Sequence, residues 1–209
     1  MDENEKKDLV RNIIIAGTSV IPMAGGVLSF FLDKYLPSAL ENRKEEFLKK
    51  IESDLNNLPD NVICKIYDNP DFTTVLVRVL HSVLAEHREE KINIFRNFLI
   101  NAATNDTITF NEEEFFLKLL DILTLDQIRL LKLFYLRDYK KSIDFSDIYH
   151  FIREHYEVDK SYLLSLSTEL IRYQLIAASE ELQRKKGNGQ QLSSIGEKFI
   201  NFIFYPIED

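Results

Sequence analysis

The sequence is poor in the residues that build disulfide frameworks and metal centres. Its 209 residues contain a single cysteine, Cys64, and only six glycines. One cysteine excludes an internal disulfide and a zinc site made of several thiolates, so the chain is predicted to reside in a reducing cytoplasm. The apolar neighbours in "NVICKIYDN" predict that Cys64 is a small buried residue rather than a reactive thiol.

Patterns that carry catalysis are missing as well. The histidines, at positions 81, 87, 150 and 155, never have the i,i+4 spacing of a helical zinc pair. There is no G-x-x-x-x-G-K-[ST], no G-x-G-x-x-G and no G-x-S-x-G. We therefore expect a non-enzymatic protein with no catalytic residues, no metal, no cofactor and no small-molecule substrate.

The chain lacks a basic region. Its net charge is −8, and no third of the sequence has the basic excess that favours nucleic-acid binding by counterion release. The beginning, "MDENEKKD", is unlike the basic start of a secretory signal, so secretion is not expected.

Helical periodicity dominates what is present. In "PSALENRKEEFLKKIESDLNNLPDN" the apolar residues recur at spacings of three and four, at Phe47, Leu48, Ile51, Leu55 and Leu58. The sequence predicts a mainly α fold, with a helical bundle over residues 1–122 and a second domain over residues 123–209. Residues 72–103 are read as two consecutive helices or one kinked helix.

Several polar pairs mark helix starts. The predicted caps are Ser38 with Glu41, Asn69 with Pro70, Asn111 with Glu114, Thr124 with Gln127, and Ser194 with Glu197. The acidic triplet at 112–114 is interpreted as a first-turn device that complements the helix dipole rather than as a metal site.

The stretch "IIIAGTSVIPMAGGVLSFFL" lies in a charge-free window of 21 residues, Asn12 to Leu32, which is long enough to span a bilayer. Its central proline and glycines would break such a span, so we favour a helix from about Lys7, a turn at 21–26, and a second helix to about Tyr35, all packed within the protein. Membrane insertion of an exposed hairpin stays an alternative. The residues that would carry it are Ile13, Pro22, Gly25, Gly26, Phe30 and Phe31.

From Thr124 to Tyr205 the predicted order is three helices, a strand, a turn, a strand and a helix. The hairpin turn is "EELQRKKGNG", with Gly187, Asn188 and Gly189 suited to positive φ. The segment "LLSLSTELIRYQLIAAS" resembles the recognition helix and first wing strand of winged-helix domains. The segment "QQLSSIGEKFINFI" resembles their second strand and final helix.

This resemblance implies a winged-helix-like domain that recognises a second macromolecule. Its candidate binding residues are Lys160, Ser161, Tyr162, Ser165, Ser167, Thr168 and Arg172 on the third helix, and Arg184, Lys185 and Lys186 on the wing. Such a helix fits the DNA major groove, and basic residues at the wing tip reach phosphates. The acidic surroundings and the single arginine on the helix favour a protein partner.

Upstream, "EEKINIFRNFLINAA" and "IPMAGG" at 21–26 resemble small uncharacterised bacterial proteins, some from defence or mobile-element neighbourhoods. Together these features predict a cytoplasmic interaction or regulatory protein of bacterial defence. In it, the bundle assembles with itself or a protein partner. Two alternatives stay open: a membrane-inserting or pore-forming effector that uses residues 13–32, and a DNA-binding transcriptional regulator.

Overall fold

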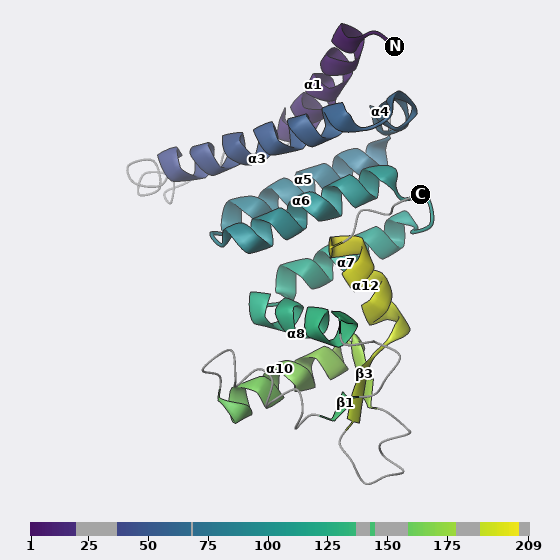
Figure 1. The fold of residues 1–209 in the computed structure, drawn as a ribbon. Coiled ribbons are helices and arrows are strands. Elements are labelled where there is room, and N and C mark those ends of the chain that lie inside the picture. Colours follow the sequence, from purple (N-terminus) through teal and green to yellow (C-terminus); the bar gives the residue numbers. More distant parts are fainter. Residues whose placement is uncertain (20–36, 68, 137–142, 145–158, 179–188, 205–209) are drawn as a thin grey trace. The chain divides into compact units, whose positions relative to one another are not determined.

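The computed structural model describes residues 1–19, 37–67, 69–136, 143–144, 159–178 and 189–204 (Figure 1). Over these residues the fold is mainly helical, as predicted, with nine helices and three short strands. The chain forms two compact units. Unit 1 is Met1–Asp121 together with Ile203–Asp209, and unit 2 is Ile122–Phe202.

Unit 1 is a bundle in which α3 lies along α5 and α6, and α1 packs on α3, α4 and α5 (Figure 1). Its helices are α1 (Glu3–Ser19), α3 (Pro37–Asn57), α4 (Asp60–Tyr67), α5 (Pro70–Ala85), α6 (Glu89–Thr104) and α7 (Phe110–Ile122). Of the apolar stripe predicted on α3, Phe47, Ile51 and Leu55 are fully buried, whereas Leu48 and Leu58 lie at its edges and are partly exposed.

The core of unit 1 is rich in phenylalanine. Phe47, Phe95, Phe98 and Phe116 are at most 1 % exposed and come from three different helices. Each buried aromatic ring removes a large apolar area from water, which favours the folded state. Close packing also depends on Gly17, because a Cβ atom there would lie 2.6 Å from Cδ2 of Leu76 on α5.

The prediction of a buried Cys64 is wrong, because this residue is exposed. Helix α4 has eight residues and buries Ile63 and Ile66. At about 100° per residue, the position of Cys64 points away from the direction shared by these two isoleucines. The apolar neighbours in the sequence therefore mark the opposite side of a short helix.

Two of the predicted helix starts are confirmed. The Asn69 side chain accepts hydrogen bonds from the backbone N–H groups of Asp71 and Phe72, and Pro70 is the first residue of α5. At the start of α8, Thr124 N donates to Gln127 Oε1 at 2.7 Å and Gln127 N donates to Thr124 Oγ1 at 3.2 Å. This reciprocal pair is a capping box.

The cap predicted at Asn111 and Glu114 is wrong by two residues. Thr109 N donates to Glu112 Oε2 at 3.0 Å, and Glu112 N donates to Thr109 Oγ1 at 3.4 Å. The observed pair, Thr109 with Glu112, and the predicted pair, Asn111 with Glu114, both have the spacing of a capping box. The helix takes the earlier pair, so α7 begins at Phe110, and Glu114 lies within the helix and forms an ion pair with Arg78.

Residues 72–103 form two helices rather than one kinked helix, because α5 ends at Ala85 and α6 begins at Glu89. Glu86 closes the turn between them: its carboxylate accepts hydrogen bonds from the N–H groups of His87 and Arg88, both at 2.9 Å. The charged patch "EHREEK" thus contains the turn.

Unit 2 combines helices with a small antiparallel sheet. Its elements are α8 (Leu125–Leu136), β1 (Ile143–Asp144), α10 (Lys160–Arg172), β2 (Ile176–Ala178), β3 (Gly189–Leu192) and α12 (Ser194–Phe204). The strand order is β1-β3-β2, with Ile143 opposite Gln190 and Ile176 opposite Leu192. Strand β2 lies within the predicted strand "LIAAS", whereas β3 begins at Gly189, one residue before the predicted strand "QQLSS". The sequence pattern did not predict β1.

The last helix is capped one residue earlier than predicted. Ser193 Oγ, rather than Ser194, accepts a hydrogen bond from Gly196 N at 2.9 Å, and Ser193 N donates to the carbonyl oxygen of Leu175 at 3.0 Å. Ser193 is anchored by its backbone to the residue before β2, so the edge of the sheet determines where α12 begins.

Several predicted features lie outside the described residues. These are the turn at 21–26 and the helix to Tyr35, the helix over 145–156, and most of the hairpin with Arg184, Lys185 and Lys186. The same holds for Pro22, Gly25, Gly26, Phe30 and Phe31 of the proposed insertion segment. The remaining member of that set, Ile13, lies on α1 and is 3 % exposed.

Candidate functional site

Helix α10 presents one face to the interior of unit 2 and the other to solvent. The carboxylate of Asp159 caps its start by accepting a hydrogen bond from Ser161 N at 3.2 Å. The buried side chains are Leu163, Leu166, Ser167 and Leu170, at the spacing of one helical stripe. Helix α10 packs on α8 and β2, which leaves the opposite face as the candidate surface.

The prediction that Ser167 is exposed is wrong. Its side chain is 1 % exposed, and Oγ donates a hydrogen bond to Gln190 Oε1 on β3 at 2.7 Å. The polar character of Ser167 suggested an outward position, but its place in the helical period is between Leu163 and Leu170. Ser167 therefore joins α10 to the central strand and takes no part in binding at the outer face.

The remaining helix candidates are exposed, namely Lys160, Ser161, Tyr162, Ser165, Thr168 and Arg172. Two further residues of this face were not among the predicted candidates: Leu164 is 52 % exposed and Ile171 is 40 % exposed. They are seven residues apart, which is close to two helical turns, and so they lie on the same side of α10. Their position off the buried stripe is the sequence signal that identifies them. We call Ser161, Leu164, Ser165, Thr168, Ile171 and Arg172 the α10 outer face.

One edge of this face is held by hydrogen bonds to the first turn of α8. The hydroxyl of Tyr162 donates to Asp126 Oδ2 at 3.0 Å, and Gln127 Nε2 donates to Glu169 Oε2 at 2.6 Å. Burial first, and then the nearby Asp126 carboxylate, raise the pKa of Tyr162 above its ordinary value. Tyr162 therefore links α10 to the first turn of α8 and is not counted with the α10 outer face.

The hydroxyls of the outer face bond to their own helix. Ser165 Oγ donates to the carbonyl of Ser161 at 3.0 Å, and Thr168 Oγ1 donates to that of Leu164 at 2.8 Å. Such back-bonding uses the hydrogen-bond donor of each hydroxyl. The surface between Leu164 and Ile171 consequently offers few free hydrogen-bond donors.

The charges around α10 are balanced. Lys160 and Arg172 lie at its two ends, and Asp159 and Glu169 carry the opposite sign. The guanidinium of Arg172 lies 5.1 Å from the ring centre of Tyr173, and its NH2 group donates to the Tyr173 hydroxyl at 3.1 Å. A surface that reads DNA carries a clear positive excess, and the described part of this surface does not.

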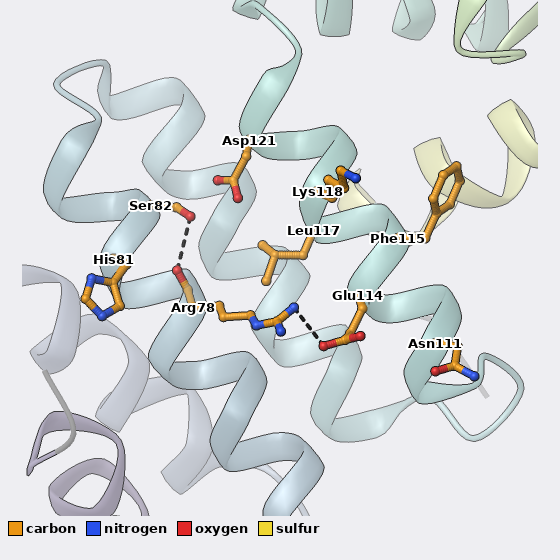
Figure 2. A pocket seen from close by; sticks show the side chains of 9 residues that line it. All are labelled: Arg78, His81, Ser82, Asn111, Glu114, Phe115, Leu117, Lys118 and Asp121. Carbon is orange, nitrogen blue, oxygen red and sulfur yellow. Dashed lines mark hydrogen bonds and ion pairs between the residues drawn. The ribbon is translucent and has the colours of Figure 1, made fainter.

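Unit 1 carries a separate groove of about 500 Å³ between α5 and α7. Figure 2 shows the side chain of Arg78 reaching across it to Glu114, with Arg78 NH1 at 2.7 Å from Glu114 Oε1. Ser82 Oγ donates to the carbonyl of Arg78 at 3.1 Å, so this hydroxyl is already bonded to its own helix. His81 lies away from Glu114, and the lining side chains pair no nucleophile with a base.

Across the described ranges, no group of three or more His, Cys, Asp or Glu side chains is placed to hold a metal ion. None of the helices in those ranges combines the length and apolar character needed to cross a bilayer.

The chain matches no family model, no curated protein and no solved structure. The resemblances to winged-helix domains and to small bacterial defence proteins therefore stay predictions from the sequence.

Proposed function

We propose that the protein is a non-enzymatic interaction or regulatory component whose unit 2 is a winged-helix-like module that binds a protein partner through the α10 outer face. The order of elements supports the winged-helix part. A helix precedes β1, α10 precedes β2, α12 follows β3, and the last strand lies between the other two.

The exposure of Leu164 and Ile171 carries the choice of a protein partner. Isolated exposed apolar residues are common, but these two lie on one side of a helix with small back-bonded hydroxyls between them. Protein interfaces are built around such desolvated apolar centres with a polar rim, and Arg172 and Ser161 are placed to supply that rim. DNA recognition would require cations where these aliphatic groups are.

The test compares partners retained by three forms of the full-length protein: wild type, Leu164→Ser with Ile171→Ser, and Ile15→Ser. Ile15 is a matched control, because it is an exposed aliphatic residue of unit 1. A partner of the α10 outer face is retained by wild type and control and lost by the double variant. Titration of that purified partner should then show at least about tenfold weaker binding to the double variant, which corresponds to about 1.4 kcal/mol. Equal affinities for all three forms would contradict the proposal.

A DNA titration tests the alternative that the α10 outer face binds DNA. We expect no binding of a mixed-sequence duplex by wild type at low salt. Binding that falls steeply with salt and is weakened by Lys160→Ala with Arg172→Ala would replace the protein partner with DNA. That salt-dependent binding would also favour a transcriptional regulator over an interaction protein.

The second part of the proposal is that the bundle of unit 1 assembles with itself. The place in bacterial defence is proposed from the sequence resemblance to defence proteins alone. Phe115 on α7 exposes a large apolar ring, which a self-association surface would cover. Light scattering of the full-length protein over a concentration series tests this part. A monomer at every concentration would contradict self-assembly.

A further inference from the structure

The three glutamates at the start of α7 have three different environments. Glu112 forms the capping box with Thr109, and Glu114 forms the ion pair with Arg78. Glu113 is the one turned inward, with only 8 % of its surface exposed. A carboxylate in this position loses most of its hydration, which costs several kcal/mol unless hydrogen bonds or cations replace it.

The charges that face Glu113 do not replace that hydration. Asp71, in the first turn of α5, repels a negative charge on Glu113, and Lys65 on α4 attracts it. Lys65 is already paired with Asp106, in the connection between α6 and α7. In the described part of the chain, Glu113 therefore faces the like charge of Asp71 and the ammonium group of Lys65, which Asp106 already engages, at this junction of α4, α5 and α7.

We propose that this junction is a proton-operated switch, in which Glu113 carries a proton when the first turn of α7 packs on α4 and α5, and loses it when that turn opens. Burial first, and then Asp71, raise the pKa of Glu113 to about 7. An open first turn returns this carboxyl to water, where it titrates near 4.5.

The sign of the pH effect follows from this difference. The closed form binds the proton more tightly, so its stability is complete below pH 4.5, falls as the pH rises, and levels off above about pH 7. Between pH 5.5 and 8.5 the opening equilibrium of the first turn should increase about 30-fold. Neutral pH lies in the middle of this range, where Glu113 of the closed form is about half protonated.

Two measurements on the full-length protein test the switch. The first is the carboxyl ¹³C shift of Glu113, which should titrate with a midpoint near 7. The second is hydrogen exchange of the α7 backbone, corrected for intrinsic rates, from pH 5.5 to 8.5. Protection of the first turn should decrease in wild type and stay constant in Glu113→Gln, whose neutral amide imitates the protonated carboxyl.

Glu112→Gln is the matched control, because glutamine also accepts the hydrogen bonds of a capping box and Glu113 is left intact. This variant should keep the wild-type pH dependence. A Glu113 carboxyl that titrates near 4.5 would overturn the proposal, as would the same pH dependence in wild type and Glu113→Gln. The wild-type titration alone decides the matter if Glu113→Gln fails to fold.

Discussion

The negative charge of the Glu86 side chain is stabilised by the groups around it. Its carboxylate accepts hydrogen bonds from Arg88 Nε at 2.9 Å and from Arg88 NH2 at 2.8 Å. It also accepts those of the two backbone N–H groups of the turn. The nearby Lys91 is 4 % exposed and donates to the carbonyl of Asp121 at 3.2 Å. The hydrogen bonds from Arg88 lower the pKa of Glu86 to about 2, against the opposing effect of burial.

We predict that Glu86→Gln destabilises the protein near neutral pH. The folded pKa of Glu86 is depressed, so its stabilising contribution is complete above pH 4.5 and is lost as the pH falls toward 2. The loss should reach up to about 3 kcal/mol at pH 7. Urea unfolding at several pH values measures it, with Glu52→Gln on the exposed side of α3 as control. A constant difference down to pH 2 would refute the assignment.

At the scale of elements, Gly196 shows how closely α12 approaches the segment that enters β2. A Cβ atom at this position would lie 2.0 Å from the carbonyl oxygen of Leu175. That oxygen also accepts the hydrogen bond from Ser193 N, so it cannot move without breaking the contact that anchors the helix start. Glycine is therefore required here by the approach of two backbones.

Gly196→Ala should destabilise unit 2 by about 3 kcal/mol or more, at the upper end of the cost of overpacking. Gly17→Ala is the comparison, because its new methyl would meet the side chain of Leu76 rather than backbone. In that helix, alanine gains about 1 kcal/mol of propensity, which offsets part of the crowding. Denaturant unfolding of both variants measures the difference, and an equal or larger effect at Gly17 would count against this account.

At the scale of the whole molecule, each compact unit has its own apolar core. Leu55, Leu76 and Phe98 are fully buried in unit 1, and Leu131 and Leu170 are fully buried in unit 2. A core of this kind makes each unit a candidate for cooperative opening by itself.

We predict that Leu170→Ala lowers hydrogen-exchange protection in α8 and α10. The loss should correspond to about 2–5 kcal/mol, as for other leucine-to-alanine truncations in a core. Protection of α5 and α6 should change by less than about 0.5 kcal/mol. Leu55→Ala should do the reverse. Mass spectrometry of exchanged peptides provides the measurement, and equal losses throughout the chain would mean that the molecule opens as one unit.

Most of the helical architecture could be predicted from the sequence because it depends on local periodicity. The stripe on α3, the start of α5 at Asn69 and the capping box at Thr124 each require only residues within a few turns of one another. The strands β2 and β3 were identifiable for the same reason, as two short segments on either side of a glycine-containing turn.

The errors arose where two local patterns were equally acceptable or where polarity was taken for exposure. Thr109 with Glu112 and Asn111 with Glu114 have the same spacing, and only the folded chain uses the first pair as a cap. Ser167 is polar yet buried against Gln190, and Leu164 and Ile171 are apolar yet exposed. Strand β1, two residues long, has too little pattern to be recognised alone.

By itself, the sequence determined a mainly helical protein, the places where two helices begin, and most of the exposed polar residues of α10. Local backbone geometry and hydrophobic spacing suffice for these features. Only the tertiary structure decided which carboxyls are charged, which helix faces meet solvent and why Gly196 must lack a side chain. These properties depend on neighbours distant in the chain, such as Asp71 beside Glu113 and Leu175 beside Gly196, whose approach no local pattern encodes.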